Sequence, residues 1–335
     1  MAARVSDVAR LAGVSPRTVS NVVNDFPHVR DATRQRVLAA IAELDYHPNI
    51  SARRLRQGRT RILGFAVPEL SQPYFAELSE LVEHAAQQRG YTVIAAQTGG
   101  VLEHEARVLR DLGSHIVDGL VFSPMSMGER ELHLAPPSVP TVLIGEQISS
   151  PRFASIAVDN VRATADLTRH LLERGRTRIA TLGAFHSDRY RSSRLRLNGY
   201  LAALEQAGVP FDPALVLYTD RFGRQAGRDG ITEAWRAGTR FDAVVCFTDM
   251  LALGAIRAFA DLGVEVPAEV AIASIDDVQE AEFSVPSLTT IAPDKQAIAE
   301  RAVDSLLAQL DGRPHEAPGI DIGYRLVVRE SSGRG

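Results

Sequence analysis

Near its N-terminus the chain reads Ser6-Asp-Val-Ala-Arg-Leu-Ala-Gly-Val-Ser-Pro-Arg-Thr-Val-Ser-Asn-Val-Val-Asn24. The first half of this stretch places apolar residues at helical spacing until Gly13 ends the pattern. Ser15 and Pro16 come next, and these residue types are favoured at the N-cap and at the first position of a helix. A short helix, a glycine turn and a second capped helix are typical of a helix-turn-helix. The stretch therefore predicts a small all-α N-terminal domain.

The second predicted helix has one apolar face and one polar face. Val19, Val22 and Val23 lie three and four residues apart, so they are expected to pack inward. The outward residues are Pro16, Arg17, Ser20 and Asn21, followed by Asn24 near the helix end. Arginine can bind guanine through two hydrogen bonds, asparagine can bind adenine, and serine can bind a base or a phosphate. The polar face is a candidate DNA-reading surface, and the alternative is a set of three small helices of no special purpose.

A third helix is predicted over residues 31–44, with Val37, Leu38, Ile41 and Leu44 as its apolar stripe. The charge of this part of the chain differs from that of the rest. Residues 1–60 contain ten arginines and five acidic residues, a net charge of +5, whereas the whole chain carries −4 and the remainder therefore −9. A basic segment on an acidic body favours contact with a polyanion such as DNA, and the alternative is an ordinary solvated surface.

The composition limits the class of protein. A length of 335 residues suggests two or three domains, and 45% hydrophobic with 23% charged residues is typical of soluble globular proteins. No apolar run approaches the roughly 20 residues that span a bilayer. The N-terminus lacks the apolar core of a signal peptide, so a cytoplasmic protein without membrane contact is expected. The single cysteine, Cys246, excludes an intrachain disulfide and a cysteine metal cluster.

The body of the chain, residues 60–335, alternates short apolar runs with amphipathic helical segments. The expected strands are 62–67, 92–96, 119–122, 141–144, 179–182, 215–217, 243–247 and 270–275. The helical segments between them include 74–89, 160–174, 194–207 and 250–262. This alternation predicts an α/β fold with parallel sheets covered on both faces. The length allows two such lobes, with a crossover near 145–155 and a ligand pocket in the cleft between them.

Motifs of common enzymes are absent from the sequence. It contains no G-x-x-x-x-G-K-[ST] phosphate loop, no G-x-S-x-G nucleophile motif and no H-E-x-x-H metal motif. The neighbours Asp276 and Asp277 do not suit an acid–base pair, because adjacent residues at a strand end point to opposite sides. We therefore expect no enzymatic activity, no catalytic residue, no cofactor and no metal site.

The stretch from 6 to 24 resembles the LacI/GalR family of bacterial repressors, and residues 33–34, 44–49 and 52–55 continue the match in register. The resemblance implies that Pro16 and Arg17, at the start of the recognition helix, are the main readers of the major groove. Many family members have arginine at the position of Asn21, so the sequence of the operator half-site is left open. The residues expected to contact operator DNA are Ser6, Ser15, Pro16, Arg17, Ser20, Asn21, Asn24, Arg30, Asn49, Ala52, Arg53 and Leu55.

Pro48 and Asn49 end the third helix, and a short segment, 50–57, follows before Gly58. A helix of this length is marginal in water on its own. The family resemblance implies a hinge helix that forms on DNA and pairs in the minor groove with the hinge helix of a second chain. Leu55 matches the leucine that wedges between base pairs and kinks the duplex, and the alternative is a plain arginine-rich linker. The expected domains are residues 1–46, the hinge 47–59 and the body 60–335.

The body resembles the sensor domain of the same family, a two-lobed fold like that of periplasmic sugar-binding proteins. The matching segments are 158–160, 194–200, 249–254, 274–277, 286–290 and 326–331. The resemblance implies that Arg196 and Asp276 bind an effector from opposite walls, one donating and one accepting hydrogen bonds. The alternative for each is a structural ion pair or a solvated charge. Further effector-binding candidates are Tyr74, Phe75, Tyr190, Ser192, Phe222 and Thr248. Asp159 is expected to cap the helix that begins near Asn160.

Together with these features, the family resemblance implies a homodimeric transcriptional repressor that binds pseudo-palindromic double-stranded operator DNA under the control of a small molecule. A carbohydrate is the favoured effector. A purine or nucleoside corepressor is the alternative. Thr248 stands where sugar-responsive family members often have asparagine, so the identity of the sugar is left open. Phe222 would stack on either kind of ring or belong to the core. The rival classes are a solute-binding protein and an enzyme without DNA regulation. The C-terminal tail, 331–335, is expected to be loose.

Overall fold

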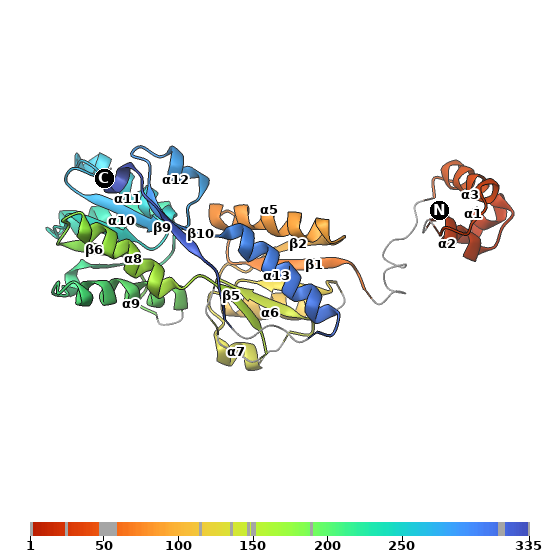
Figure 1. Cartoon of the computed structure of the whole chain (residues 1–335), viewed down its shortest axis with the longest axis horizontal. Helices are drawn as coiled ribbons and strands as arrows, with labels where there is room; N and C mark the ends of the chain where they lie inside the picture. Colours follow the sequence, from red (N-terminus) through yellow and green to blue (C-terminus); the bar gives the residue numbers. More distant parts are fainter. Residues whose placement is uncertain are drawn as a thin grey trace. The chain divides into compact units, whose positions relative to one another are not determined.

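The computed structural model describes residues 3–23, 26–46, 59–113, 116–134, 137–145, 148, 152–187, 190–313 and 319–333. They form two compact units, Met1–Thr60 and Arg61–Gly335. Each unit has a hydrophobic core of its own. Figure 1 shows both, coloured along the chain.

Three helices make up the described part of the N-terminal unit: α1 (Val5–Ala12), α2 (Pro16–Val23) and α3 (Asp31–Glu43). Gly13 ends α1 in the left-handed conformation, with φ of 63°, which a residue without a side chain adopts easily. Ser15 then caps α2, because its Oγ accepts a hydrogen bond from Thr18 N at 3.1 Å. The predicted helix-turn-helix is therefore confirmed, with α1 beginning one residue before Ser6.

The core of this unit is small and is built mainly from valine and alanine. Val8, Val19 and Val37, one from each helix, are completely buried. The prediction that Leu38 belongs to the inward stripe of α3 is wrong, since its side chain is 45% exposed. Ala40 takes the inward position instead, three residues after Val37 on the same helical face. Three short helices packed this closely leave room only for small side chains between them.

The second unit contains two mainly parallel sheets with helices on both faces (Figure 1). In the described residues, the first sheet consists, in spatial order, of β2 (Thr92–Gln97), β1 (Ile62–Val67), β3 (Gly119–Phe122), β4 (Thr141–Ile144), β5 (Ala154–Ala157) and β11 (Ile320–Asp321). Its helices are α5 (Pro73–Gln88) and α13 (Lys295–Leu310) on one face, and α6 (Leu102–Gly113) and α7 (Glu129–Leu134) on the other. This sheet and its helices are the first lobe.

The second sheet and its helices form the second lobe. Its described strands are, in spatial order, β7 (Val216–Tyr218), β6 (Ile179–Ala184), β8 (Ala243–Cys246), β9 (Ala271–Ile275), β10 (Thr289–Pro293) and β12 (Tyr324–Val327), and β12 runs antiparallel to β10. Its helices are α8 (Asn160–Glu173) and α9 (Arg191–Gln206) on one face, α10 (Arg224–Arg236) and α11 (Asp249–Leu262) on the other, the short α12 (Gln279–Phe283), and 3₁₀ turns at Pro213–Leu215 and Glu330–Ser332. All eight expected strands are present, whereas the sequence pattern does not predict β5, β10, β11 and β12.

Within the described residues, three segments of chain connect the two lobes: one after β5, one after β10 and one between β11 and β12. Two backbone hydrogen bonds join these segments. Ile322 N donates to Ala157 O at 3.0 Å, and Asp294 N donates to Gly323 O at 3.1 Å. The predicted crossover at 145–155 is wrong, because β5 still pairs with β4 in the first sheet. The first crossing follows Ala157.

The helix pairs of the second lobe touch closely through glycine. A Cβ atom on Gly254 of α11 would lie 2.0 Å from Arg224 O of α10. A Cβ atom on Gly199 of α9 would lie 2.2 Å from Val161 O of α8. Because real Cβ atoms do not approach backbone atoms this closely, each helix pair requires a glycine at its contact point.

We predict that Gly254→Ala lowers the free energy of unfolding by about 1–3 kcal/mol, because the added methyl group forces α10 and α11 apart. Gly323→Ala is the matched control, since a Cβ atom there would have no neighbour within 4 Å. Urea unfolding followed by circular dichroism measures both variants. Equal stabilities for the two would contradict the close contact between the helices.

The C-terminal residues up to 333 are packed against the second lobe. Ser331 and Ser332 are buried. Ser331 Oγ donates to Ile272 O at 2.7 Å and accepts from Thr289 N at 2.8 Å, while Ser332 Oγ lies 2.9 Å from His170 Nε2. The prediction of a loose tail is therefore wrong for these residues, because their hydroxyl groups complete hydrogen bonds of the second sheet.

Burial lowers the pKa of His170 below its ordinary value of 6.5. The folded state thus favours the neutral ring, and this contribution to stability is lost as the pH falls through about 6.5 toward the lower folded-state pKa. We predict that His170→Gln loses less stability than the wild type when the pH falls from neutral into this window, because glutamine has no ring to protonate. Chemical unfolding at the two pH values measures it, with His133→Gln at an exposed position as the control. Identical pH dependence of His170→Gln and wild type would exclude this role.

Candidate functional site

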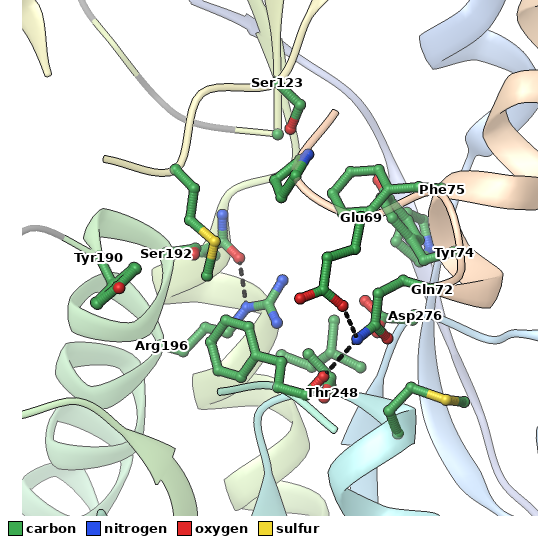
Figure 2. A pocket seen from close by; sticks show the side chains of 18 of the residues that line it. Glu69, Gln72, Tyr74, Phe75, Ser123, Tyr190, Ser192, Arg196, Thr248 and Asp276 are labelled. Atoms are coloured by element: carbon green, nitrogen blue, oxygen red, sulfur yellow. Dashed lines mark hydrogen bonds between the residues drawn. The ribbon is translucent and has the colours of Figure 1, made fainter. Parts of the chain in front are cut away.

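A cavity of about 210 Å³ lies between the two lobes, at the carboxyl ends of their parallel strands. Pro68 and Ser123 follow β1 and β3 in the first lobe, and Thr248 and Asp276 follow β8 and β9 in the second. Figure 2 shows the side chains around it. Every residue expected to bind an effector lies on its wall: Tyr74, Phe75, Tyr190, Ser192, Arg196, Phe222, Thr248 and Asp276.

Arg196 reaches the cavity from α9 and is held by two hydrogen bonds. Its Nε donates to Asn160 Oδ1 at 2.8 Å, and its Nη1 donates to Phe247 O. Asn160 is the first residue of α8 and is 4% exposed, so the acceptor is itself fixed. Neither bond uses Nη2, which leaves part of the planar guanidinium group for a ligand.

Asp276, a residue that is 7% exposed, places its carboxylate on the other side of the cavity (Figure 2). Arg196 and Asp276 both belong to the second lobe. The backbone φ is 136° at Asp276 and 48° at Asp277, values that are uncommon for residues with a side chain. Burial raises the pKa of the Asp276 carboxyl, and the nearby Arg196 and Lys295 offset part of this rise. The carboxylate therefore gains from a ligand that donates hydrogen bonds to it.

The turn that carries Asp276 is fixed by the buried carboxylate of Asp249. Its Oδ1 accepts hydrogen bonds from Ser274 Oγ at 2.5 Å and Thr290 Oγ1 at 2.7 Å, and its Oδ2 accepts one from Val278 N at 2.9 Å. Burial and the neighbouring Asp276 raise the pKa of Asp249, and the three donors act in the opposite direction. The two carboxyl groups thus share a region in which hydrogen bonds replace water.

Aromatic side chains line the cavity from both lobes. Tyr74 and Phe75 stand together on α5, with ring centroids 5.3 Å apart. In the second lobe, Phe185 contacts Tyr190 and Phe222, with centroid distances of 4.2 and 4.8 Å. A ring-shaped ligand with apolar faces can contact aromatic surface on both sides, while the charged groups meet its polar edge.

Several polar residues of the cavity wall are not predicted as effector contacts by the sequence pattern. They are Glu69, Gln72, Ser123, Asn160, Asp220 and Arg221. Most of them follow a strand or begin a helix, and the rule that ligands bind at the carboxyl ends of parallel strands provides a signal for them. Gln72 has no such signal. It stands at the N-cap of α5 without capping it, and its Nε2 instead donates to Phe222 O at 2.7 Å and to Glu69 Oε2 at 3.2 Å (Figure 2).

Two residues near the cavity cap helices. Asp159 Oδ1 accepts a hydrogen bond from Arg162 N at 2.9 Å, which confirms Asp159 as the cap of α8. Thr248 Oγ1 accepts one from Leu251 N at 3.3 Å and caps α11. The Thr248 hydroxyl thus has a structural partner in addition to its place on the cavity wall.

The N-terminal unit carries the residues expected to read DNA. Pro16, Arg17 and Ser20 are exposed on α2, and Asn21 beside them is half-buried. The further candidates Ser6, Ser15 and Arg30 are exposed as well. The remaining candidates lie outside the described residues: Asn24, Asn49, Ala52, Arg53 and Leu55.

The described residues contain no group of histidine, cysteine and acidic side chains that could hold a metal ion. No helix among them combines the length and the apolar character needed to cross a membrane. Cys246 is fully buried, and this burial raises the pKa of its thiol.

Comparison with known proteins identifies both parts of the chain. Residues 4–49 match the family described as bacterial regulatory proteins, lacI family, and residues 168–332 match a periplasmic binding protein-like domain. Over 334 residues the chain is 34% identical to the HTH-type transcriptional repressor PurR of Aliivibrio fischeri, with 98% of each chain covered. The chain belongs to the LacI family.

Solved structures of LacI-family proteins share the fold. A lac repressor dimer bound to operator and the anti-inducer ONPF matches with a TM-score of 0.87 and 27% identity, over 100% of both chains. A complex of the transcriptional regulator CelR with cellobiose matches with a TM-score of 0.73 and 29% identity, over 98% of this chain and 99% of that one. The predicted helix-turn-helix with a two-lobed α/β unit is confirmed, and the chain is a LacI-family transcriptional regulator.

Proposed function

We propose that this LacI-family regulator is a cytoplasmic, homodimeric repressor, and that a sugar bound between its lobes controls its affinity for operator DNA. The observation that carries the proposal is the chemistry of the cavity. A fixed guanidinium and a poorly solvated carboxylate face a space with aromatic rings from both lobes. Such a site can hydrogen-bond the hydroxyl groups of a sugar and contact the apolar faces of its ring. The cellobiose complex of CelR, a protein with the same fold, supports a carbohydrate.

A purine or nucleoside corepressor is the second candidate effector. Aromatic surface on both sides of the cavity suits a flat base as well as a sugar ring. The polar edge of a base can also donate to Asp276 and accept from Arg196. Both candidate effectors would therefore use the same residues, and a ligand screen is needed to distinguish them.

In the proposed DNA complex, two chains place their α2 helices in the major groove of a pseudo-palindromic operator. Pro16 and Arg17 read base edges, with Ser20 and Asn21 adding base or phosphate contacts. The hinge residues 47–59 enter the minor groove, where Leu55 opens the central base step. The operator-bound lac repressor dimer, which has the same fold, supports both the dimer and the DNA target.

Effector and DNA would be coupled through the arrangement of the lobes. A ligand that touches both lobes favours one arrangement of the lobes over another. The hinge segment of each chain is joined to its first lobe and would move with it. A coupling free energy of about 1–3 kcal/mol is typical of such systems. A negative coupling makes the effector an inducer, and a positive coupling makes it a corepressor.

We predict that a thermal-shift screen with galactose, glucose, cellobiose, hypoxanthine, guanine and adenosine gives a positive shift for a sugar. A ligand at 100 times its Kd adds about 2.7 kcal/mol of stability. Arg196→Ala should abolish this shift and leave DNA binding unchanged, because it removes the donor that faces the ligand. Arg194→Ala, at an exposed position on the same helix, is the matched control. A full shift with Arg196→Ala would show that the effector binds elsewhere, and a shift for the purines alone would favour the second candidate.

We predict separate effects of the two DNA-reading elements on an operator selected from random DNA. Arg17→Ala should cost about 1–3 kcal/mol and relax the preference at one base pair of each half-site. Leu55→Ala should weaken operator binding strongly and leave non-specific DNA binding nearly intact, because a wedge acts where the duplex is kinked. Fluorescence anisotropy with operator and non-specific duplexes measures both. Unchanged operator affinity of Leu55→Ala would exclude the wedge.

A further inference from the structure

Three side chains of the first lobe cross the cleft and bind backbone atoms of the second lobe. Gln72 Nε2 donates to Phe222 O at 2.7 Å, Glu77 Oε1 accepts from Gln279 N at 2.8 Å, and Lys295 Nζ donates to Asp277 O at 2.9 Å. Gln72 and Glu77 belong to the start of α5, and Lys295 is the first residue of α13. These contacts are additional to the three chain segments that connect the lobes.

Each of the three contacts ends on a segment that carries a cavity residue. Phe222 is itself part of the cavity wall. Asp277 follows Asp276, and Gln279 follows Val278, and both preceding residues line the cavity. The first lobe therefore binds those parts of the second lobe that would meet a ligand.

Lys295 is placed in a way that a solvated lysine is not. It is the single lysine of the chain, and its side chain is 11% exposed. Its ammonium group forms an ion pair with Glu77 and lies 5.7 Å from the ring centroid of Tyr74. Holding a long charged side chain in such a place costs side-chain entropy and desolvation, so its contacts must compensate. One of these contacts, the bond to Asp277 O, crosses between the lobes.

Gln72 points to the same arrangement independently. Gln72 stands at the N-cap of α5, where its side chain makes no hydrogen bond with that helix. Its amide instead reaches across to Phe222 O and is oriented by Glu69, which accepts from the same nitrogen. The residue thus serves the contact between lobes rather than its own helix.

We propose that Gln72, Glu77 and Lys295 form an interlobe clamp that positions the second-lobe wall of the cavity before any ligand binds. They are positioning residues, because they act through Phe222 and through the turn that carries Asp276. The clamp binds backbone atoms, so it fixes this wall whatever side chains the wall presents. The role of the clamp in effector binding rests on the proposed function, in which this wall contacts the effector. Its existence is testable without a ligand.

The experiment measures the distance between the lobes in the ligand-free, full-length protein. Spin labels on Glu103→Cys of α6 and Glu233→Cys of α10 report this distance by double electron–electron resonance, since both positions are exposed and Cys246 is fully buried. Dilution with unlabelled chain removes distances between the two subunits of a dimer. The variants are Gln72→Ala, Glu77→Ala, Lys295→Met, their combination, and Lys295→Arg.

We expect one narrow distance population in the wild type and an additional, longer one in the triple variant. The loss of each hydrogen-bonded contact should raise the open-to-closed ratio about five-fold. Lys295→Arg should show the wild-type distance distribution, unlike Lys295→Met, because arginine keeps the positive charge and the hydrogen-bond donor. Glu80→Ala with Gln296→Ala, exposed neighbours on the same two helices, should leave the distribution unchanged.

A triple variant that is folded and shows the wild-type distribution would overturn the clamp. If the triple variant does not fold, the double variant Gln72→Ala with Lys295→Met decides by the same criterion, since it removes one contact from each helix. A positive clamp result together with no ligand in the screen would count against the proposed effector and not against the clamp. If a ligand binds but the triple variant keeps the wild-type distance distribution, the result would count against the clamp and not against the proposed effector.

Discussion

The second-lobe wall of the cavity depends on one buried carboxylate. Asp249 begins α11 and accepts hydrogen bonds from Ser274 in β9, from Thr290 in β10 and from Val278 N after the turn. The turn itself contains two residues with positive φ, a conformation that costs on the order of 1–3 kcal/mol for a residue with a side chain and persists when surrounding contacts determine it. Asp249 joins two strands and the turn into one support, and this support places Asp276 at the cavity.

The same arrangement explains why the cavity is suited to a polar ligand. Asp249 and Asp276 are both buried, and burial raises the pKa of each. Three internal donors bind Asp249, whereas Asp276 faces the cavity, with the positive charges of Arg196 and Lys295 nearby. A ligand that donates hydrogen bonds to Asp276 therefore replaces solvation that the fold has removed. Arg196 is already oriented by Asn160 and Phe247 O, so little ordering remains to be done on binding.

Much of this could be predicted from the sequence, because the deciding signals are local. Each of these signals involves residues that are close together in the sequence: the Ser15-Pro16 cap, the alternation of strands and helices, and the polar residues directly after strands. The sequence does not predict β11 because it has only two residues. Polar residues interrupt the apolar pattern of the other three unpredicted strands, namely Ser155 in β5, the threonines of β10 and Arg325 in β12. The crossover after Ala157 depends on which sheet β5 joins. The contacts of Gln72 and Lys295 could not be predicted, because their partners lie 150 and 18 residues away, in the other lobe. Leu38 shows the same limit within one helix, where packing selects Ala40 instead.

The clamp also restricts how a ligand could change the protein. A ligand shifts an equilibrium only by its difference in affinity for the two states. If Gln72, Glu77 and Lys295 already hold the second-lobe wall in place, contacts of the ligand with that wall alone favour neither arrangement. The difference must then come from groups of the first lobe at the cavity, among them Tyr74, Phe75 and Glu69. Tyr74 and Phe75 stand on α5, the helix that also carries Glu77, so a ligand that displaces this helix acts on the clamp directly. Effector binding and lobe arrangement would thus meet on α5.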